Sequence, residues 1–189
     1  YPGAYKEYVC VAAIAADFTP ATYTNYGPGT NISAPGGDTD YHRSDYGGVL
    51  FTLPPQHGDY GYMDGTSMAC PHVSGVAALG LSHAAKLHKR FGSRQYRDLL
   101  LRSVKDIDEH LVSQKFYYKS WSTMGEINGT LMDLRNNYRG KMGSGVIDAA
   151  LLLKNVENEG VAMTLPNVYV ASGSKQKVDV MRYFDDGET

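Results

Sequence analysis

The sequence predicts an α/β protein with a parallel β-sheet, and two apolar segments carry this prediction. Residues Tyr8 to Ala16 form a continuous apolar run, which is typical of a strand covered on both faces of a parallel sheet. Residues Met68 to Leu81 contain no charged side chain and several small ones. A helix of this composition is expected to be buried rather than amphipathic. Pro71 lies in its first turn, where proline costs little.

Shorter elements are expected between and after these two segments. Residues 20–64 are rich in proline and glycine, and they predict short strands at Asn31–Ser33 and Gly48–Leu53 joined by turns. Ser93 is expected to cap a second helix. Its apolar face would consist of Tyr96, Leu99, Leu100, Ser103 and Val104. A last helix is expected from Gly145 to about Asn155.

The character of the chain changes after Asn158. Val168–Ala171 and Lys177–Val180 have strand propensity and flank a turn at Gly173. An isolated hairpin is marginally stable in water, so a segment of this kind needs further strands or a surface to pack on. We therefore expect a domain over residues 1–158 and the beginning of a β-rich domain, or a docking tail, over residues 159–189.

Composition excludes several functional classes. The 189 residues carry a formal net charge of −2, which argues against binding to nucleic acid or to an anionic membrane. No apolar run reaches membrane-spanning length. The histidine and cysteine spacings match no zinc site, and we expect no cofactor. Cys10 and Cys70 fall on the expected core strand and helix, where free thiols are the favoured state and a disulfide remains the alternative.

The start of the apolar helix carries the chemistry. Ser67 stands where a helix presents unpaired N–H groups and a positive partial charge. A serine in this place can attack a carbonyl while its own N–H stabilises the oxyanion. The alternative is a capping role for Thr66 or Ser67, because both residue types are common caps. Capping requires one hydroxyl residue, whereas the whole segment Gly65–Gly75 is patterned.

That segment reads Gly-Thr-Ser-Met-Ala-Cys-Pro-His-Val-Ser-Gly, and it resembles the nucleophile motif of the subtilases, the subtilisin-like serine endopeptidases. Further matches follow in family order at Tyr1–Tyr5, Thr22–Gly27, Ile32–Gly36 and Gly143–Ala149. The resemblance covers residues 1 to about 155 and implies a three-layer fold with a parallel sheet. Residues of about 109–140 do not match the family core. Their aromatic side chains are expected to pack onto the domain: Phe116, Tyr117, Tyr118 and Trp121.

The resemblance also implies roles for single residues. Ser67 would be the acyl-forming nucleophile, and Thr66 would support the oxyanion. The residues implied to contact the peptide or protein substrate are Tyr23, Met63, Asp64 and Gly65 on the leaving-group side, and Tyr1, Pro2 and Gly3 near the floor of the main specificity pocket. Carbonyls at Gly3, Tyr5 and Tyr8 match a weak cation site of some relatives, but we expect no metal here.

The remaining parts of a subtilase site are missing from the sequence. The family takes its catalytic Asp from an Asp-Ser/Thr-Gly motif and its His from a His-Gly-Thr motif, and neither occurs here. The family's oxyanion Asn precedes the Tyr-Pro-Ala segment that Tyr1 begins. We therefore expect the C-terminal half of a catalytic domain, inactive alone. His72 lies about 140° around the helix from Ser67, and His57 lies in a loop, so neither is expected to act as the base.

Three functions compete at this stage. The first is a secreted, periplasmic or cell-surface serine endopeptidase. Its missing N-terminal half is the expected partner and would cover the apolar helix and one edge of the first strand. An oligomer covering that surface is the alternative. The second is a degenerate subtilase that serves as a binding or scaffold module. The third, an α/β-hydrolase esterase, requires Gly-x-Ser-x-Gly, whereas Ala69 stands at the last position. The intact motif around Ser67 favours the first.

Overall fold

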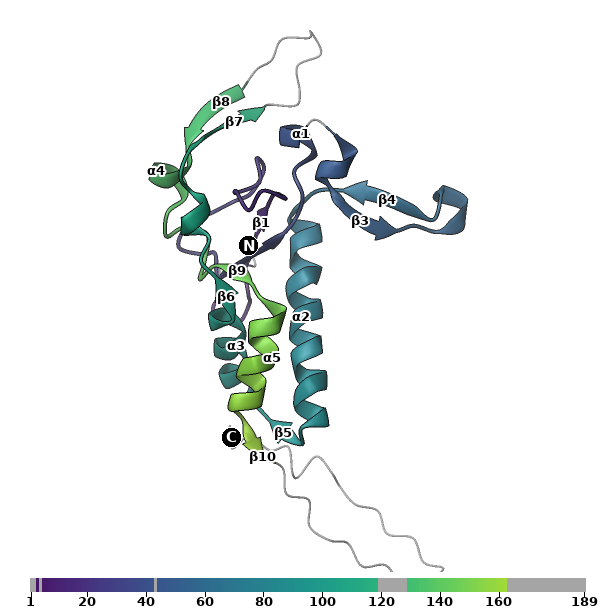
Figure 1. Cartoon of the computed structure of the whole chain (residues 1–189), viewed down its shortest axis with the longest axis vertical. Coiled ribbons are helices and arrows are strands. Elements are labelled where there is room, and N and C mark those ends of the chain that lie inside the picture. The colour runs from purple at the N-terminus through teal and green to yellow at the C-terminus, as the bar shows by residue number, and fades with distance from the viewer. Residues whose placement is uncertain (1–2, 4, 43, 119–128, 163–189) are drawn as a thin grey trace, which may run out of the picture.

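The computed structural model describes residues 3, 5–42, 44–118 and 129–162. Helices and strands alternate along the chain (Figure 1). The strands are β1 Val11–Ile14, β2 Ile32–Pro35, β3 Val49–Thr52, β4 Tyr60–Met63, β5 Lys89–Arg90, β6 Val104–Lys105, β7 Gln114–Tyr118, β8 Gly129–Asp133, β9 Val146–Ile147 and β10 Val161–Ala162. The α-helices are α1 Thr39–His42, α2 Thr66–Lys86, α3 Ser93–Arg102, α4 Leu134–Tyr138 and α5 Ala149–Asn158, and short 3₁₀ turns cover Asp45–Gly47, Pro55–His57 and Asp108–His110.

The central sheet has the strand order β1-β2-β9-β6. β1 and β2 pair in parallel from Val11 opposite Ile32 to Ile14 opposite Pro35. β2 and β9 are also parallel, and β6 adds an antiparallel edge. The predicted α/β fold with parallel pairing is therefore confirmed. The β3–β4 and β7–β8 hairpins are separate two-stranded sheets, which lie beyond the N-terminal end of α2 in Figure 1.

Side chains of β1 alternate between two cores, as the two-residue period of a strand requires. Ala13 belongs to the core formed with α2, α3 and α5, which includes Val73, Leu99 and Leu152. Ala12 and Ile14 belong to a second core on the opposite face of the sheet. Both faces of β1 are thus covered, which explains why the whole strand is apolar.

The second core is built mainly from residues 107–142, which pack on the sheet. Its buried members beyond the sheet are Ile107, Leu111, Tyr117, Leu134, Tyr138 and Met142. The packing predicted for the aromatic residues is confirmed for Tyr117, which is 7% exposed. Trp121 lies outside the described residues, and the side chain of Tyr118 is not described. This segment therefore completes the fold as a structural layer.

Within the described part of the chain, α2 is buried on one face only. One face of the helix is buried in the first core through Ala69, Val73, Gly80 and Ala84. The opposite face is solvent-exposed and consists mainly of apolar or small residues: Cys70, Pro71, Ser74, Gly75, Ala78, Leu79, Leu81 and Ala85. No described element covers this second face. The described core therefore buries only part of the apolar surface of α2.

Other boundaries differ locally from the expectations. Gly92, not Ser93, is the N-cap of α3 and makes no side-chain capping bond, although Tyr96, Leu99 and Leu100 form the predicted buried face. Gly145 lies outside the last helix at φ +140°, with the Lys105 carbonyl too close to admit a side chain. α5 begins after Asp148, whose Oδ1 accepts the Leu151 N–H at 3.0 Å. Glycine at Gly145 serves this close approach.

Only the beginning of the predicted β-rich C-terminal segment lies within the described residues. The strands expected at 168–171 and 177–180 lie outside the described residues. Just before them, β10 pairs antiparallel with β5, Val161 opposite Arg90 and Ala162 opposite Lys89. Cys10 and Cys70 are free thiols, as favoured from the sequence. No helix in the described part of the chain is long and apolar enough to cross a membrane.

Candidate active site

Ser67 lies in the first turn of α2 with its side chain exposed. The preceding cap, Gly65, has φ +149°, a conformation that side chains rarely adopt. Its carbonyl accepts hydrogen bonds from the N–H groups of Met68 at 3.0 Å and Ala69 at 3.3 Å. Gly65 therefore turns the chain sharply from β4 into the helix and leaves the Ser67 hydroxyl at the helix start, where partial positive charge favours an anion.

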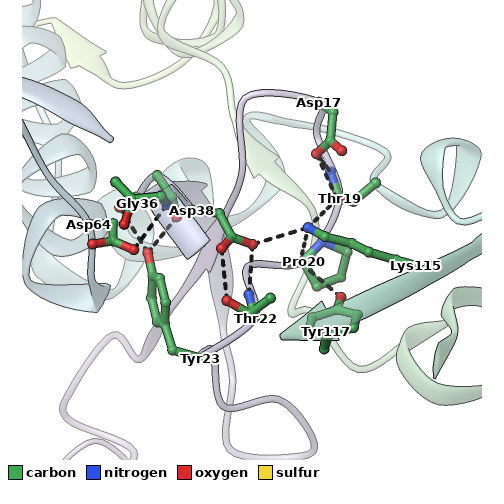
Figure 2. A network of polar contacts seen from close by, with 12 residues as sticks. Asp17, Thr19, Pro20, Thr22, Tyr23, Gly36, Asp38, Asp64, Lys115 and Tyr117 are labelled. Atoms are coloured by element: carbon green, nitrogen blue, oxygen red, sulfur yellow. Dashed lines mark hydrogen bonds and ion pairs between the residues drawn. The ribbon is translucent and has the colours of Figure 1, made fainter. Parts of the chain in front are cut away.

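The carboxyl end of β2 and the ring of Tyr23 fix this turn from below. The Gly65 N–H donates to the Gly36 carbonyl at 2.9 Å and to the Tyr23 phenol oxygen at 2.8 Å. The Tyr23 hydroxyl lies within hydrogen-bond distance of the carbonyls of Gly36 and Gly37, at 2.8 and 2.7 Å, as Figure 2 shows around Gly36. Gly36 has no room for a side chain, because a Cβ would approach Ala13 Cβ to 2.6 Å and the Gly65 carbonyl to 2.9 Å.

Electrostatics keep the Tyr23 phenol neutral. Burial raises its pKa well above the ordinary range, and the negative charges of Asp64 and Asp38 raise it further, against an opposing effect of the Gly65 N–H bond. A neutral phenol can accept from Gly65 and donate to a carbonyl at the same time. Tyr23 therefore acts as a two-sided hydrogen-bond bridge under the nucleophile turn.

The other residues implied to line the leaving-group side lie at the end of β4. Met63 is about half exposed. The Asp64 carboxylate accepts the backbone N–H of Thr39, the first residue of α1, at 3.2 Å. Asp64 thus has a structural contact in addition to any contact with substrate.

Two hollows meet at Ser67. One, of about 290 Å³, is lined by Val49, Phe51, Ser67, Met68, Pro71 and His72. The other, of about 770 Å³, is lined by Gly3, Tyr8, Val9, Cys10, Val11, Thr66, Ser67, Cys70, Pro71 and Ser74. The structure therefore brings Gly3 to the same surface as Thr66 and Ser67. Tyr1 and Pro2, also implied for this surface, lie outside the described residues.

A comparison with protein families identifies the family of this chain. The model of the subtilase family matches residues 1–118, so the expectation that the family match is interrupted from about residue 109 is wrong for 109–118. The chain belongs to the subtilase family. Curated relatives are an extracellular basic protease of Dichelobacter nodosus, 31% identical over 59% of this chain, and subtilisin NAT of Bacillus subtilis subsp. natto, 35% identical over 62%. The chain spans only 18% and 26% of these two proteins.

Solved structures agree with the fold. A protease from Pseudoalteromonas arctica superposes with a TM-score of 0.57 at 24% identity, over 82% of this chain and 38% of that chain. A lanthipeptide protease superposes with a TM-score of 0.56 at 24% identity, over 81% and 42%. At this identity the likeness shows the fold alone. The predicted family and fold class are confirmed.

No described histidine of this subtilase chain hydrogen-bonds to Ser67. The His72 Nδ1 lies 2.7 Å from the Met68 carbonyl, which fixes this ring against the first turn of α2. His57 stands in the 3₁₀ turn at the tip of the β3–β4 hairpin, beyond the last paired residues. The His83 Nε2 contacts Glu157, about 24 Å along the helix from Ser67. That neither His57 nor His72 is the base stays a prediction.

Two further residues near the site, Asp38 and Lys115, are not indicated by any sequence pattern. Their side chains, 0% and 2% exposed, form an ion pair with 3.2 Å between Lys115 Nζ and Asp38 Oδ2. Asp38 lies three residues after the end of β2, and Lys115 lies on β7. Lysine and aspartate are almost never fully buried unless paired, and the pairing joins segments too distant in sequence to be matched by pattern.

Proposed function

We propose that this chain is the nucleophile-bearing part of a subtilase serine endopeptidase. The observation that carries the proposal is the exposed Ser67 hydroxyl at the start of α2, on a turn bonded to Gly36 and Tyr23. Family membership supports a serine peptidase, and a peptide or protein would be the substrate.

The proposed chemistry is acyl transfer. Ser67 Oγ attacks the scissile carbonyl as its proton passes to a histidine base, and the Ser67 N–H donates to the oxyanion with support from Thr66. The protonated base then gives this proton to the leaving nitrogen, the amine departs, and water hydrolyses the acyl-enzyme. Tyr23, Met63, Asp64 and Gly65 would border the leaving group. Tyr1, Pro2 and Gly3 would border the specificity pocket.

We place the base, its orienting carboxylate and the oxyanion Asn in a segment preceding this chain in a longer protein. Among the histidine side chains that the structure describes, none hydrogen-bonds to Ser67, and this supports the assignment. The exposed apolar face of α2 supports it as well, because a second half of the domain would cover that face. We propose a catalytic-domain segment over residues 1–158 and a β-rich segment from 159 onward, for which the pairing of β10 with β5 suggests an attachment point.

We also propose that the full protein is exported. The relative from Dichelobacter nodosus is named an extracellular protease. A Bacillus subtilis relative, 31% identical, is named an intracellular one. Fractionation of the source organism would decide between the two locations, with activity in the culture medium or periplasm expected.

The central test is covalent labelling of the full-length protein with a fluorogenic organophosphonate. We expect one label at Ser67, located by mass spectrometry, and hydrolysis of a fluorogenic peptide. Ser67→Ala should abolish both, whereas Ser82→Ala, a matched change at an exposed serine farther along α2, should leave both unchanged. The isolated chain should remain unlabelled. A folded full-length protein that does not label would identify the scaffold function instead.

A further inference from the structure

The buried Lys115–Asp38 pair connects β7 with the loop that follows β2, close to Thr22 and Tyr23 (Figure 2). We propose that Lys115 and Asp38 are positioning residues for Ser67 and for the leaving-group surface at Tyr23. This inference rests on the proposed peptidase function. Neither side chain is assigned a contact with substrate; both act through the residues they bind.

Lys115 binds one short stretch of chain at several points. Its ammonium group donates to Thr19 Oγ1 at 2.8 Å, to the Pro20 carbonyl at 3.0 Å and to Asp38 Oδ2 at 3.2 Å. Tyr117 lies two residues on, so it projects from the same face of β7. Its hydroxyl donates to the same Pro20 carbonyl at 2.9 Å. β7 therefore clamps the start of the segment that carries Tyr23.

Asp38 continues the connection. Its Oδ2 accepts the Thr22 N–H at 2.9 Å, and its Oδ1 accepts the Thr22 hydroxyl at 2.8 Å. Both carboxylate oxygens thus fix the residue before Tyr23. The phenol of Tyr23 in turn accepts the Gly65 N–H, two residues before Ser67. The path from Lys115 to the nucleophile consists of the ion pair, these hydrogen bonds, the Thr22–Tyr23 peptide and the short segment from Gly65 to Ser67.

The ionic character of the pair gives it this role. Removing either partner takes one charge out of a buried pair and leaves the other charge in surroundings shielded from water. The remaining charge must then draw in water or move, and either response displaces the Thr22–Tyr23 segment. A misplacement of about 1 Å at a reacting group can cost about a hundredfold in rate. An apolar contact of the same size would stabilise the fold without fixing the direction of the Asp38 carboxylate.

The test measures the nucleophile per folded molecule in the full-length protein. Lys115→Met removes the ammonium and keeps most of the side-chain volume. Organophosphonate labelling gives two numbers: the final stoichiometry, which counts folded sites, and the rate constant, which reports Ser67 itself. We expect Lys115→Met to lower the rate constant at least tenfold. The kcat for peptides extended on the leaving-group side should fall more than KM rises.

Two further variants separate positioning from stability. Leu152→Ala truncates a fully buried residue of α5 far from Ser67 and should lower the melting temperature with an unchanged rate constant. Lys115→Met combined with Asp38→Asn removes both charges and should recover part of the lost rate. An unchanged labelling rate constant in folded Lys115→Met would overturn the inference. So would a rate constant of Leu152→Ala that falls as much as that of Lys115→Met, because the rate would then follow stability alone. Absence of labelling in the unmutated protein would instead contradict the proposed function.

Discussion

The phenol oxygen of Tyr23 accepts the backbone N–H of Gly65 at 2.8 Å and so ties an aromatic ring to the turn that carries Ser67. The two residues come from separate loops, one after β1 and one after β4. Because the same N–H also reaches the Gly36 carbonyl, the turn has a second anchor on the sheet. Two hydrogen bonds therefore hold the helix cap that precedes the nucleophile.

Tyr23→Phe removes one of the two acceptors of the Gly65 N–H. We expect the free energy of unfolding to fall by about 1 kcal/mol, the usual net value of one hydrogen bond. The Ser67 labelling rate of the full-length protein should fall by up to about fivefold, because about 1.4 kcal/mol corresponds to tenfold. Tyr26→Phe, in the same loop and packed on Tyr138, is the control. Equal effects of the two substitutions would remove the special role of Tyr23.

Two glycines of α2 should respond to alanine in opposite ways. At Gly80 a Cβ would approach Leu152 Cδ2 to 2.9 Å and the Tyr96 hydroxyl more closely still, so Gly80→Ala should cost about 1–3 kcal/mol. At Gly75 a Cβ meets open space. Gly75→Ala should therefore stabilise the isolated chain by about 0.8–1 kcal/mol through helix propensity. Urea unfolding of both variants measures the two signs.

The same pair tests whether a further segment covers α2. In the full-length protein the gain at Gly75→Ala should disappear or reverse, because the exposed face would then be packed. A gain that persists there would show that this face stays open.

Stability should decline with rising pH above about 10. Burial raises the pKa of Tyr23 and Tyr117 above their ordinary value of 10.0. Above pH 10 the unfolded chain loses these protons and the folded chain retains them, so the free energy of unfolding falls as pH increases. Urea titrations between pH 8 and 11 measure this slope. Tyr117→Phe should lower stability at pH 8 but make the slope shallower, and an unchanged slope would contradict the assignment.

The exposed face of α2 predicts how the isolated chain behaves in solution. Apolar surface in water costs about 25 cal/mol per Å², so the chain should bind a hydrophobic dye or elute above its monomer mass of 20.7 kDa. Leu79→Ser combined with Leu81→Ser should reduce both signals. Leu131→Ser, at an exposed leucine of the β7–β8 hairpin, should not. A cooperative, dye-silent monomer would contradict this prediction.

Local chemistry made part of this structure predictable. The motif at Gly65–Gly75 placed Ser67 at a helix start, and the apolar run around β1 indicated a strand covered on both faces. The sequence predicts a helix that includes Gly145, whereas the structure places Gly145 outside it, close to the Lys105 carbonyl. Only the folded chain reveals this close approach. The burial of Lys115 could not be predicted from the sequence for a similar reason. Its charge alone indicates a solvent-exposed position, and its burial depends on Asp38, a residue brought close by the fold.

The distance in sequence between β2 and β9 has a consequence for folding during synthesis. The Ser33 hydroxyl on β2 donates to the Met142 carbonyl, 109 residues further along the chain, and β9 follows Met142 directly on the same side of the sheet. A ribosome adding 5–20 residues per second needs roughly 5–20 s to reach it. Throughout that interval β2 has β1 on one side and an unpaired edge on the other, and such edges recruit other strands. We therefore expect the nascent chain to be most prone to aggregation after β2 has formed and before β9 is synthesised.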